Sequence, residues 1–323
     1  MSEPSPSAFQ SSASPAANGL AETLAALMSH SRWLSLGGAL LLLAMLPTFA
    51  LSLLHPQQFN GIDAYDKPLK FQLSLAVYLL SLAWMRGHLT PAGRARRVAV
   101  LTDVVPTLAA FGEAAYILWR ASRGEASHFN VASPLASALY GLMGVGALLL
   151  VAASGVLAWL LRRHAQAGLN AAYLASVRHG LWLTMILGGL VGAYLSSQTG
   201  HAVGGTLGGA PGGIPNDSFG LPLAGWSRVA GDLRVPHFFG IHAMQLLPLF
   251  GWALTRNKRR AAPNVSHPHG GRTTCVVGLG ALSRRWPEPA ATTAVHAAAI
   301  AYAAFTVLTF VQAAAGVPFL FGL

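Results

Sequence analysis

Seven long apolar runs constrain this chain more than any other feature of its sequence. An α-helix rises 1.5 Å per residue, so a run of about 20 apolar residues can cross the roughly 30 Å hydrocarbon core of a bilayer. Only 10% of the 323 residues are charged, whereas an average soluble domain carries about 25%. We therefore expect an all-α, polytopic transmembrane helix bundle with helices at approximately 33–54, 69–85, 98–119, 135–161, 176–197, 236–254 and 291–316.

The segments outside these runs differ in composition. Residues 1–31 begin with a stretch rich in Ser, Pro and Ala, and we expect a disordered tail there, ahead of a transmembrane domain over 32–323. Residues 198–235 hold ten glycines and three prolines in 38 residues. Because so long a connection is usually a functional cover or disorder, we expect a lid. Residues 255–290 form a basic loop.

The 21 Lys and Arg residues are divided unequally between the two sides of the predicted bundle. Fifteen lie on the side of the N-terminus and six on the other. The positive-inside rule then places the N-terminus in the cytoplasm, and the C-terminus and the lid outside. This orientation also accounts for the net charge of +11, so we expect the lipid bilayer and no nucleic acid as a partner.

Two polar residues lie inside apolar runs near the outer side. Glu113 precedes the outer end of its helix by about 10 Å, and His242 lies at nearly the same depth on a helix of opposite direction. A carboxylate at this depth costs a few kcal/mol unless it is paired, neutral or in a wet cavity, so Glu113 is a functional candidate. The alternative for Glu113 is a structural pair with Arg120 or with an arginine of a neighbouring loop. The alternative for His242 is a core histidine hydrogen-bonded to Glu113 or to a carbonyl.

Several imidazoles on the outer side are candidates for holding a cofactor or a metal ion. Gln245 follows His242 by three residues and lies on nearly the same helix face. His237 and His242 are five residues apart, roughly 140° around the axis, so they cannot form a two-histidine clamp. Further ligands must come from other segments, and the candidates are His128 and His201.

Charged residues on the same side are candidates for recognising a solute or activating water. Lys70 begins a polar stripe that continues with Ser74, Tyr78 and Ser81 at helical spacing. Such a stripe faces other helices or water, although snorkelling also explains a lysine at a helix end. Candidate ligand-binding residues are Lys70, Arg234 and Glu113, and candidate catalytic residues are Glu113 and Asp232.

A smaller polar set lies near the cytoplasmic side, and its residues are Asp103, Arg178, His179 and His296. An aspartate with an arginine can be a plain interfacial pair, so a functional role for this set is left open. Gly188 and Gly192 form a GxxxG pattern that allows two helices to approach closely.

The runs GHAVGG and GWSRVAGDLRVPHFFGIHAMQLLP, together with DKPLKF and RGEASHFN, carry a resemblance. In these motifs, written GHxVGG and GDLRxxHFxGxHAxQ, the chain resembles a group of uncharacterised bacterial multi-pass inner-membrane proteins. The similarity covers roughly residues 63–248. It implies the membrane topology and the same loops, and it implies no chemistry.

The sequence leaves three classes of function open. It does not decide whether the chain is an enzyme. The first is binding of a cofactor or small ligand at the periplasmic face, with haem b held by imidazoles as the most concrete form and a quinone-type molecule as another. The second is a metal-dependent membrane hydrolase, with histidines holding Zn²⁺ and Glu113 or Asp232 activating its water. The third is a transporter or ligand sensor. The first ranks ahead of the other two.

Overall fold

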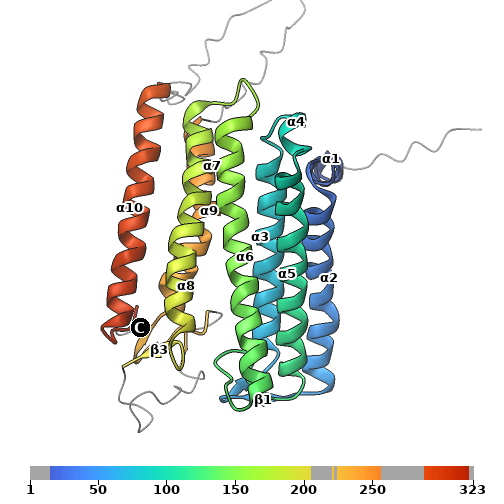
Figure 1. Cartoon of the computed structure of the whole chain (residues 1–323), viewed down its shortest axis with the longest axis vertical. Helices are drawn as coiled ribbons and strands as arrows, with labels where there is room; N and C mark the ends of the chain where they lie inside the picture. Colours follow the sequence, from blue (N-terminus) through green and yellow to red (C-terminus); the bar gives the residue numbers. More distant parts are fainter. Residues whose placement is uncertain (1–14, 205–219, 222–223, 256–286, 320–323) are drawn as a thin grey trace, which may run out of the picture.

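The computed structural model describes residues 15–204, 220–221, 224–255 and 287–319. Seven helices within these ranges are long and apolar enough to cross a membrane. They stand side by side in one bundle (Figure 1). In chain order they are α2 (Arg32–Leu54), α3 (Asp66–Arg86), α5 (Arg97–Ala121), α6 (Pro134–His164), the continuous α7 (Ala171–Leu183), η1 (Thr184–Gly188) and α8 (Gly189–Ser196), then α9 (Arg234–Thr255) and α10 (Glu288–Ala314).

The predicted all-α bundle with seven apolar helices is confirmed, and each helix lies within about five residues of its expected bounds. Many large apolar side chains point outward from the bundle, among them Leu43, Leu190 and Ile300, which are 59%, 68% and 71% exposed. A soluble protein rarely exposes contiguous apolar surface on this scale. These side chains match the hydrocarbon of a bilayer.

One expectation for the N-terminal residues is wrong. Within the stretch 1–31 that was expected to be disordered, residues Pro15–His30 form helix α1. Its Leu27 packs against the main hydrophobic cluster, and the ring of His30 lies over Gly87, where an added Cβ would be 2.3 Å from the imidazole. Contacts with the bundle therefore stabilise a helix that the composition of the segment did not predict. Residues 1–14 lie outside the described ranges.

The helices pack in two groups joined along α6 and α7. The first group contains α2, α3, α5 and α6, and the second contains α7 to α10. The largest cluster of buried apolar side chains belongs mainly to the first group and reaches Val177, Leu181 and Met244 of the second. The two groups therefore share one core at their junction.

Small residues let α9 approach α7 and the η1 turn closely. An added Cβ at Gly240 would lie 2.9 Å from the backbone nitrogen of Gly188, and one at Gly180 would lie 2.8 Å from the carbonyl oxygen of Ala243. The packing expected of Gly188 is thus confirmed. Both of these packed elements are locally irregular. Helix α9 contains Pro248, which has no N–H to donate, and η1 is a π-helical turn between α7 and α8.

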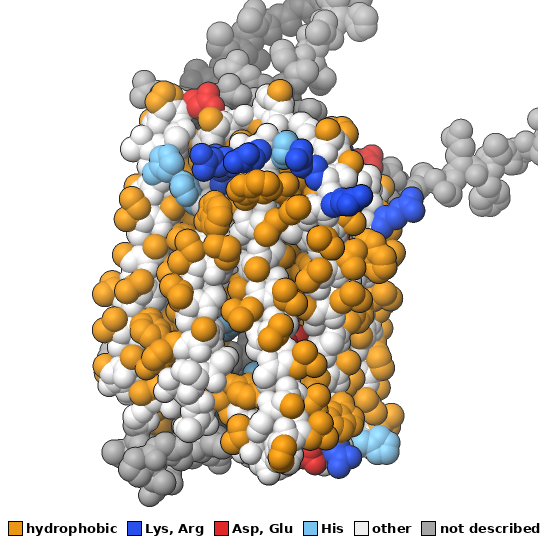
Figure 2. All heavy atoms as spheres, in the orientation of Figure 1, with side chains coloured by type: hydrophobic (Ala, Val, Ile, Leu, Met, Phe, Trp, Pro, Cys, Tyr) orange, Lys and Arg blue, Asp and Glu red, His pale blue; other side chains and the backbone are white. Residues whose placement is uncertain are grey.

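The two ends of the bundle differ in charge. The end that carries helix α4 (Pro91–Arg94), called here the basic end, has a row of Lys and Arg side chains just above the apolar surface (Figure 2). Exposed arginines at this end are Arg32, Arg96, Arg97, Arg162 and Arg163. The opposite end, called here the hairpin end, carries two short antiparallel pairs of strands, β1 (Gln58–Phe59) with β2 (Ile62–Asp63) and β3 (Ala202–Val203) with β4 (Gly231–Asp232).

Candidate functional site

Side chains of α9 and α3 form a hydrogen-bonded relay inside the bundle. Nδ1 of His242 lies 3.3 Å from Oε1 of Gln245, and Nε2 of Gln245 donates to Oγ of Ser81 over 3.2 Å. The hydroxyl of Ser81 in turn donates to the carbonyl of Val77, 2.7 Å away. The predicted proximity of Gln245 to His242 is confirmed, and the partner of this histidine is a side-chain amide rather than Glu113 or a backbone carbonyl.

The direction of this relay fixes the protonation of the imidazole. Because the hydroxyl proton of Ser81 is donated to Val77, the serine oxygen must accept from the amide of Gln245. The amide therefore presents its oxygen to His242, and Nδ1 of that ring must carry the hydrogen. In the neutral ring Nε2 is then an unprotonated acceptor. This is the nitrogen with which His242 can bind a ligand.

An aromatic side chain lies beside the same imidazole. The ring of Phe238 is 4.2 Å from that of His242, measured between centroids, and it comes one helical turn earlier on α9. Phe238 is 41% exposed and His242 is partly buried. The partly buried imidazole is thus flanked by an aromatic ring that is exposed on the surface of the bundle.

Glu113 is buried in α5, with 7% of its surface exposed. Its Oε1 lies against α6, 2.7 Å from where a Cβ on Gly146 would be. The positive charge acting on it comes from Lys67 at the start of α3. The expected alternative of a pair with Arg120 is wrong, because Nη1 of Arg120 lies 2.8 Å from Oε2 of Glu125.

His128 lies in the connection between α5 and α6, at the hairpin end. It packs against Phe71, with ring centroids 5.5 Å apart, and its Nδ1 lies 3.1 Å from Oγ of Ser127. Burial lowers the pKa of His128 well below 6.5, and the charges of Lys67 and His237 lower it further. His128 is thus held neutral.

His237 faces the second group of helices rather than the relay. A Cβ on Gly192 would lie 3.0 Å from its ring, so a glycine leaves the space that this imidazole fills. Its Nδ1 is buried and has no well-formed hydrogen bond to a described residue. The expectation that His237 and His242 lie on different faces of α9 is confirmed.

Asp232 and Arg234 bind each other. Nη2 of Arg234 lies 2.7 Å from Oδ2 of Asp232, and the same carboxylate accepts the backbone N–H groups of Ser227 and Arg234 over 2.8 and 3.0 Å. Arg234 also donates to the carbonyl of Gly225. The pair therefore fixes the segment before α9, and the predicted roles of Asp232 in catalysis and of Arg234 in ligand binding remain predictions.

The remaining candidates lie at the rim of the hairpin end. Nζ of Lys70 is 3.9 Å from Oδ2 of Asp66, which comes one turn earlier on α3. The same Nζ lies near Gly225, in the described part of the lid segment. The backbone oxygen of His201 accepts from Leu233 over 2.9 Å, beside the β3–β4 pair.

The described part of the lid segment packs on aromatic side chains. The ring of Trp226 lies 5.4 Å from that of Phe238 and 5.7 Å from that of Phe319. Most of the predicted lid, 205–219 and 222–223, and the basic loop at 256–286 lie outside the described ranges.

The described residues at this site do not form a zinc centre, and the predicted haem site remains a prediction. Among the described residues no group of three or more His, Cys, Asp and Glu side chains is arranged to hold a metal ion, and structural or catalytic Zn²⁺ needs three or four protein ligands. A bis-imidazole haem needs two rings facing each other across the iron. The contacts that the structure shows for the rings of His242, His237 and His128 are with Gln245, with the space beside Gly192 and with Phe71.

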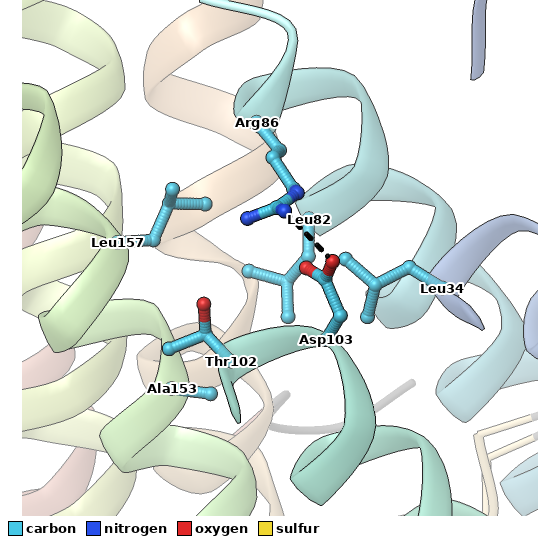
Figure 3. Close-up of a pocket in the computed structure, with 7 residues that line it drawn as sticks. All are labelled: Leu34, Leu82, Arg86, Thr102, Asp103, Ala153 and Leu157. Atoms are coloured by element: carbon cyan, nitrogen blue, oxygen red, sulfur yellow. Dashed lines mark ion pairs between the residues drawn. The ribbon is translucent and has the colours of Figure 1, made fainter. Parts of the chain in front are cut away.

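The polar set predicted near the cytoplasmic side separates into two places. Asp103 pairs with Arg86, 3.0 Å away, in a pocket that is otherwise lined mainly by apolar side chains from α2, α3, α5 and α6 (Figure 3). His179 and His296 contact each other on α7 and α10, in the other group of helices. An arginine does pair with Asp103, but it is not Arg178.

Two residues with structural contacts escaped prediction from the sequence: Arg86 and His88. Nε2 of His88 lies 3.0 Å from the hydroxyl of Tyr173, which joins the end of α3 to α7. Both residues lie at a helix end, with no pattern that reveals their partners.

No protein-family model, no curated protein and no solved structure matches this chain.

Proposed function

We propose that this chain is a multi-pass membrane protein that binds a small lipid-soluble ligand at His242, with a hydroxyl group on the ligand as the hydrogen-bond donor. The observation that carries the proposal is the relay from Val77 through Ser81 and Gln245, which leaves Nε2 of the imidazole as an acceptor. A ring carrying a hydroxyl group and an isoprenoid tail, as in a quinol, has this chemistry.

The depth of the site supports a ligand that dissolves in the bilayer. His242 follows the start of α9 at Arg234 by eight residues, or about 12 Å along the helix. Phe238 provides an apolar wall for a ring, and aromatic pairs contribute about 0.5–1.5 kcal/mol beyond burial of area. A strongly polar solute would instead have to bury several polar groups of its own without hydrogen-bond partners, which costs free energy.

We also propose an orientation of the helix bundle across the membrane. The uneven distribution of Lys and Arg supports a cytoplasmic basic end and a periplasmic hairpin end in a bacterial inner membrane. His128 lies at the hairpin end, and Glu113 comes eight residues before the end of α5 at Ala121, so it is nearly level with His242. The charge of Lys67 acts on both Glu113 and His128. In this orientation they border the approach to the ligand from the periplasmic side.

The test is binding of a short-tailed quinol to the purified protein under anaerobic conditions, followed by thermal shift and by titration. We expect the quinol to bind more tightly than the matching quinone, because only the quinol donates to Nε2. His242→Leu should weaken quinol binding about tenfold, since one hydrogen bond contributes about 1 kcal/mol or slightly more. Gln245→Leu should weaken it less, because the ring remains but its orientation is lost.

His55→Leu is the matched control, because His55 is exposed in the connection after α2. It should leave quinol binding unchanged. Equal quinol affinity in the wild type and in His242→Leu would overturn the proposal. A Soret band or one equivalent of zinc in the purified wild type would favour the cofactor or hydrolase class instead.

A further inference from the structure

Arg178 and His179 are neighbours on α7, and His179 contacts His296 of α10 near the basic end, where the charge of Arg178 acts on it; the three residues are called here the cluster. Nε2 of His179 lies 2.8 Å from Nδ1 of His296, and the two ring centroids are 4.9 Å apart. Arg178 makes no ion pair or hydrogen bond with any residue that the structure describes, and its Nε is buried without a partner there. The cluster thus contains a permanent cation that the described part of the chain does not neutralise.

The position of this cluster along the helices is fixed by a contact at their starts. Oε1 of Glu288 accepts the backbone N–H of Ala171 over 2.9 Å where α10 and α7 begin. His179 and His296 each come eight residues later on the same two helices, or about 12 Å further. In Figure 2 histidine side chains lie beside the row of basic side chains, at the upper limit of the apolar surface.

The histidine pair can present donors to an anion. In the neutral pair one ring donates to the other, so one of the two remaining nitrogens carries a hydrogen and the other does not. With one more proton, both outward nitrogens become donors and the pair becomes positive. An anion next to Arg178 therefore favours uptake of that proton.

We infer that this cluster binds the phosphate of an anionic phospholipid in the leaflet at the basic end. Arginine and imidazolium groups both form charge-assisted hydrogen bonds with phosphate oxygens. Below the cluster, toward the middle of the bundle, Ile300 and Ile186 are 71% and 43% exposed. Ile300 follows His296 by one turn, and Ile186 follows His179 by two turns, so an acyl chain descending from the phosphate meets apolar side chains.

The inference does not depend on the ligand proposed for His242, since the two sites lie on different elements and at different depths of the bundle. It is tested by native mass spectrometry and thermal shift of the full chain in phosphatidylcholine micelles, with phosphatidylglycerol added. We expect phosphatidylglycerol to bind and stabilise the wild type. Arg178→Gln should weaken that binding about fivefold, which is roughly the contribution of one basic residue at an anionic surface.

His296→Gln should weaken binding at pH 6 and have less effect at pH 8, because the extra donor exists only when the pair is protonated. Arg163→Gln is the matched control: this arginine is in the same basic end but stacks on Trp159, 5.1 Å from the ring centroid. Equal losses in Arg178→Gln and Arg163→Gln would mean general attraction to the basic row and would overturn the site. Stabilisation by inorganic phosphate through Arg178 would overturn the lipid as its source.

Discussion

Arg86 and Asp103 form an ion pair 3.0 Å long in the core of the basic end, and each side chain is only 6% exposed. The same guanidinium donates to the carbonyls of His30, Ala99 and Arg94 over 3.1, 2.8 and 2.9 Å. One side chain of α3 thereby holds α1, α4 and α5 in place. Its charge is compensated within the protein rather than by water or lipid.

Asp103→Ala should destabilise the protein by about 3–5 kcal/mol, because it leaves the guanidinium of Arg86 buried without its counter-charge. The double variant that combines Arg86→Met with Asp103→Ala should lose less stability than the sum of the losses in Arg86→Met alone and Asp103→Ala alone. The measurement is a double-mutant cycle on unfolding in detergent. Simple additivity would mean that the pair contributes no coupling energy.

Gly240→Ala should destabilise the bundle by about 1–3 kcal/mol, since the new Cβ would meet backbone atoms of η1 that cannot move aside easily. Gly141→Ala is its control, because no atom lies within 4 Å of the added Cβ there. The control should be neutral or slightly stabilising, as alanine favours a helix by about 1 kcal/mol over glycine. Thermal melts of both variants are the measurement, and equal melting temperatures would contradict the close approach.

Thr184→Val should cost about 1–3 kcal/mol although the two side chains have nearly the same shape. The hydroxyl of Thr184 donates to the carbonyl of Ile241 and accepts the N–H of Met244, both over 3.1 Å. Valine leaves both backbone groups of α9 without this partner. Thr293→Val, whose hydroxyl is exposed and bonds only within α10, should change the melting temperature little.

Stability should fall as the pH is lowered below about 6.5, in part because of His128. Burial lowers the pKa of this histidine in the folded chain, so below the unfolded value of about 6.5 the unfolded state binds a proton that the folded state does not. The loss per histidine is at most about 1.4 kcal/mol per pH unit and ends at the folded pKa. His128→Gln should flatten the dependence of the melting temperature on pH between pH 7 and pH 5, and an unchanged slope would contradict this explanation.

Orientation can be tested with reporter fusions. Fusions after Arg97 and Arg163 should report the cytoplasm, and a fusion near Glu125 should report the other side, because the Lys and Arg residues are concentrated at the first end. A fusion near His55 is the matched control, and it should agree with the one near Glu125. An external signal after Arg163 would reverse the orientation.

The seven helices follow from the apolar runs because a backbone in hydrocarbon must satisfy its hydrogen bonds within a helix or a closed barrel. Some helix starts also had local signals, such as the side chains of Ser133 and Asn170 that cap α6 and α7. Helix α1 had no comparable signal, because its stability comes from contacts such as that of Leu27 with the core.

The candidate site was only partly predictable, because helical spacing predicts contacts within one helix but not contacts between helices. The spacing of His242 and Gln245 on one helix places them together, and the relay confirms it. The link from Gln245 to Ser81 depends on how far α3 is shifted along α9, which side-chain packing sets and periodicity does not. The partner of Arg86 is equally hidden, since a charge at the end of an apolar run looks the same whether it is buried or solvated.

The hydroxyl of Tyr78 on α3 donates to the carbonyl of Leu150 on α6, on the basic-end side of Glu113. Beyond it the leucine-rich core of α3, α5 and α6 fills the bundle. This hydrogen bond and the apolar side chains beyond it hold α3 against α6 between Glu113 and the basic end. A path for a solute between α3 and α6 would therefore require these two helices to separate and the hydroxyl of Tyr78 to give up its bond to Leu150.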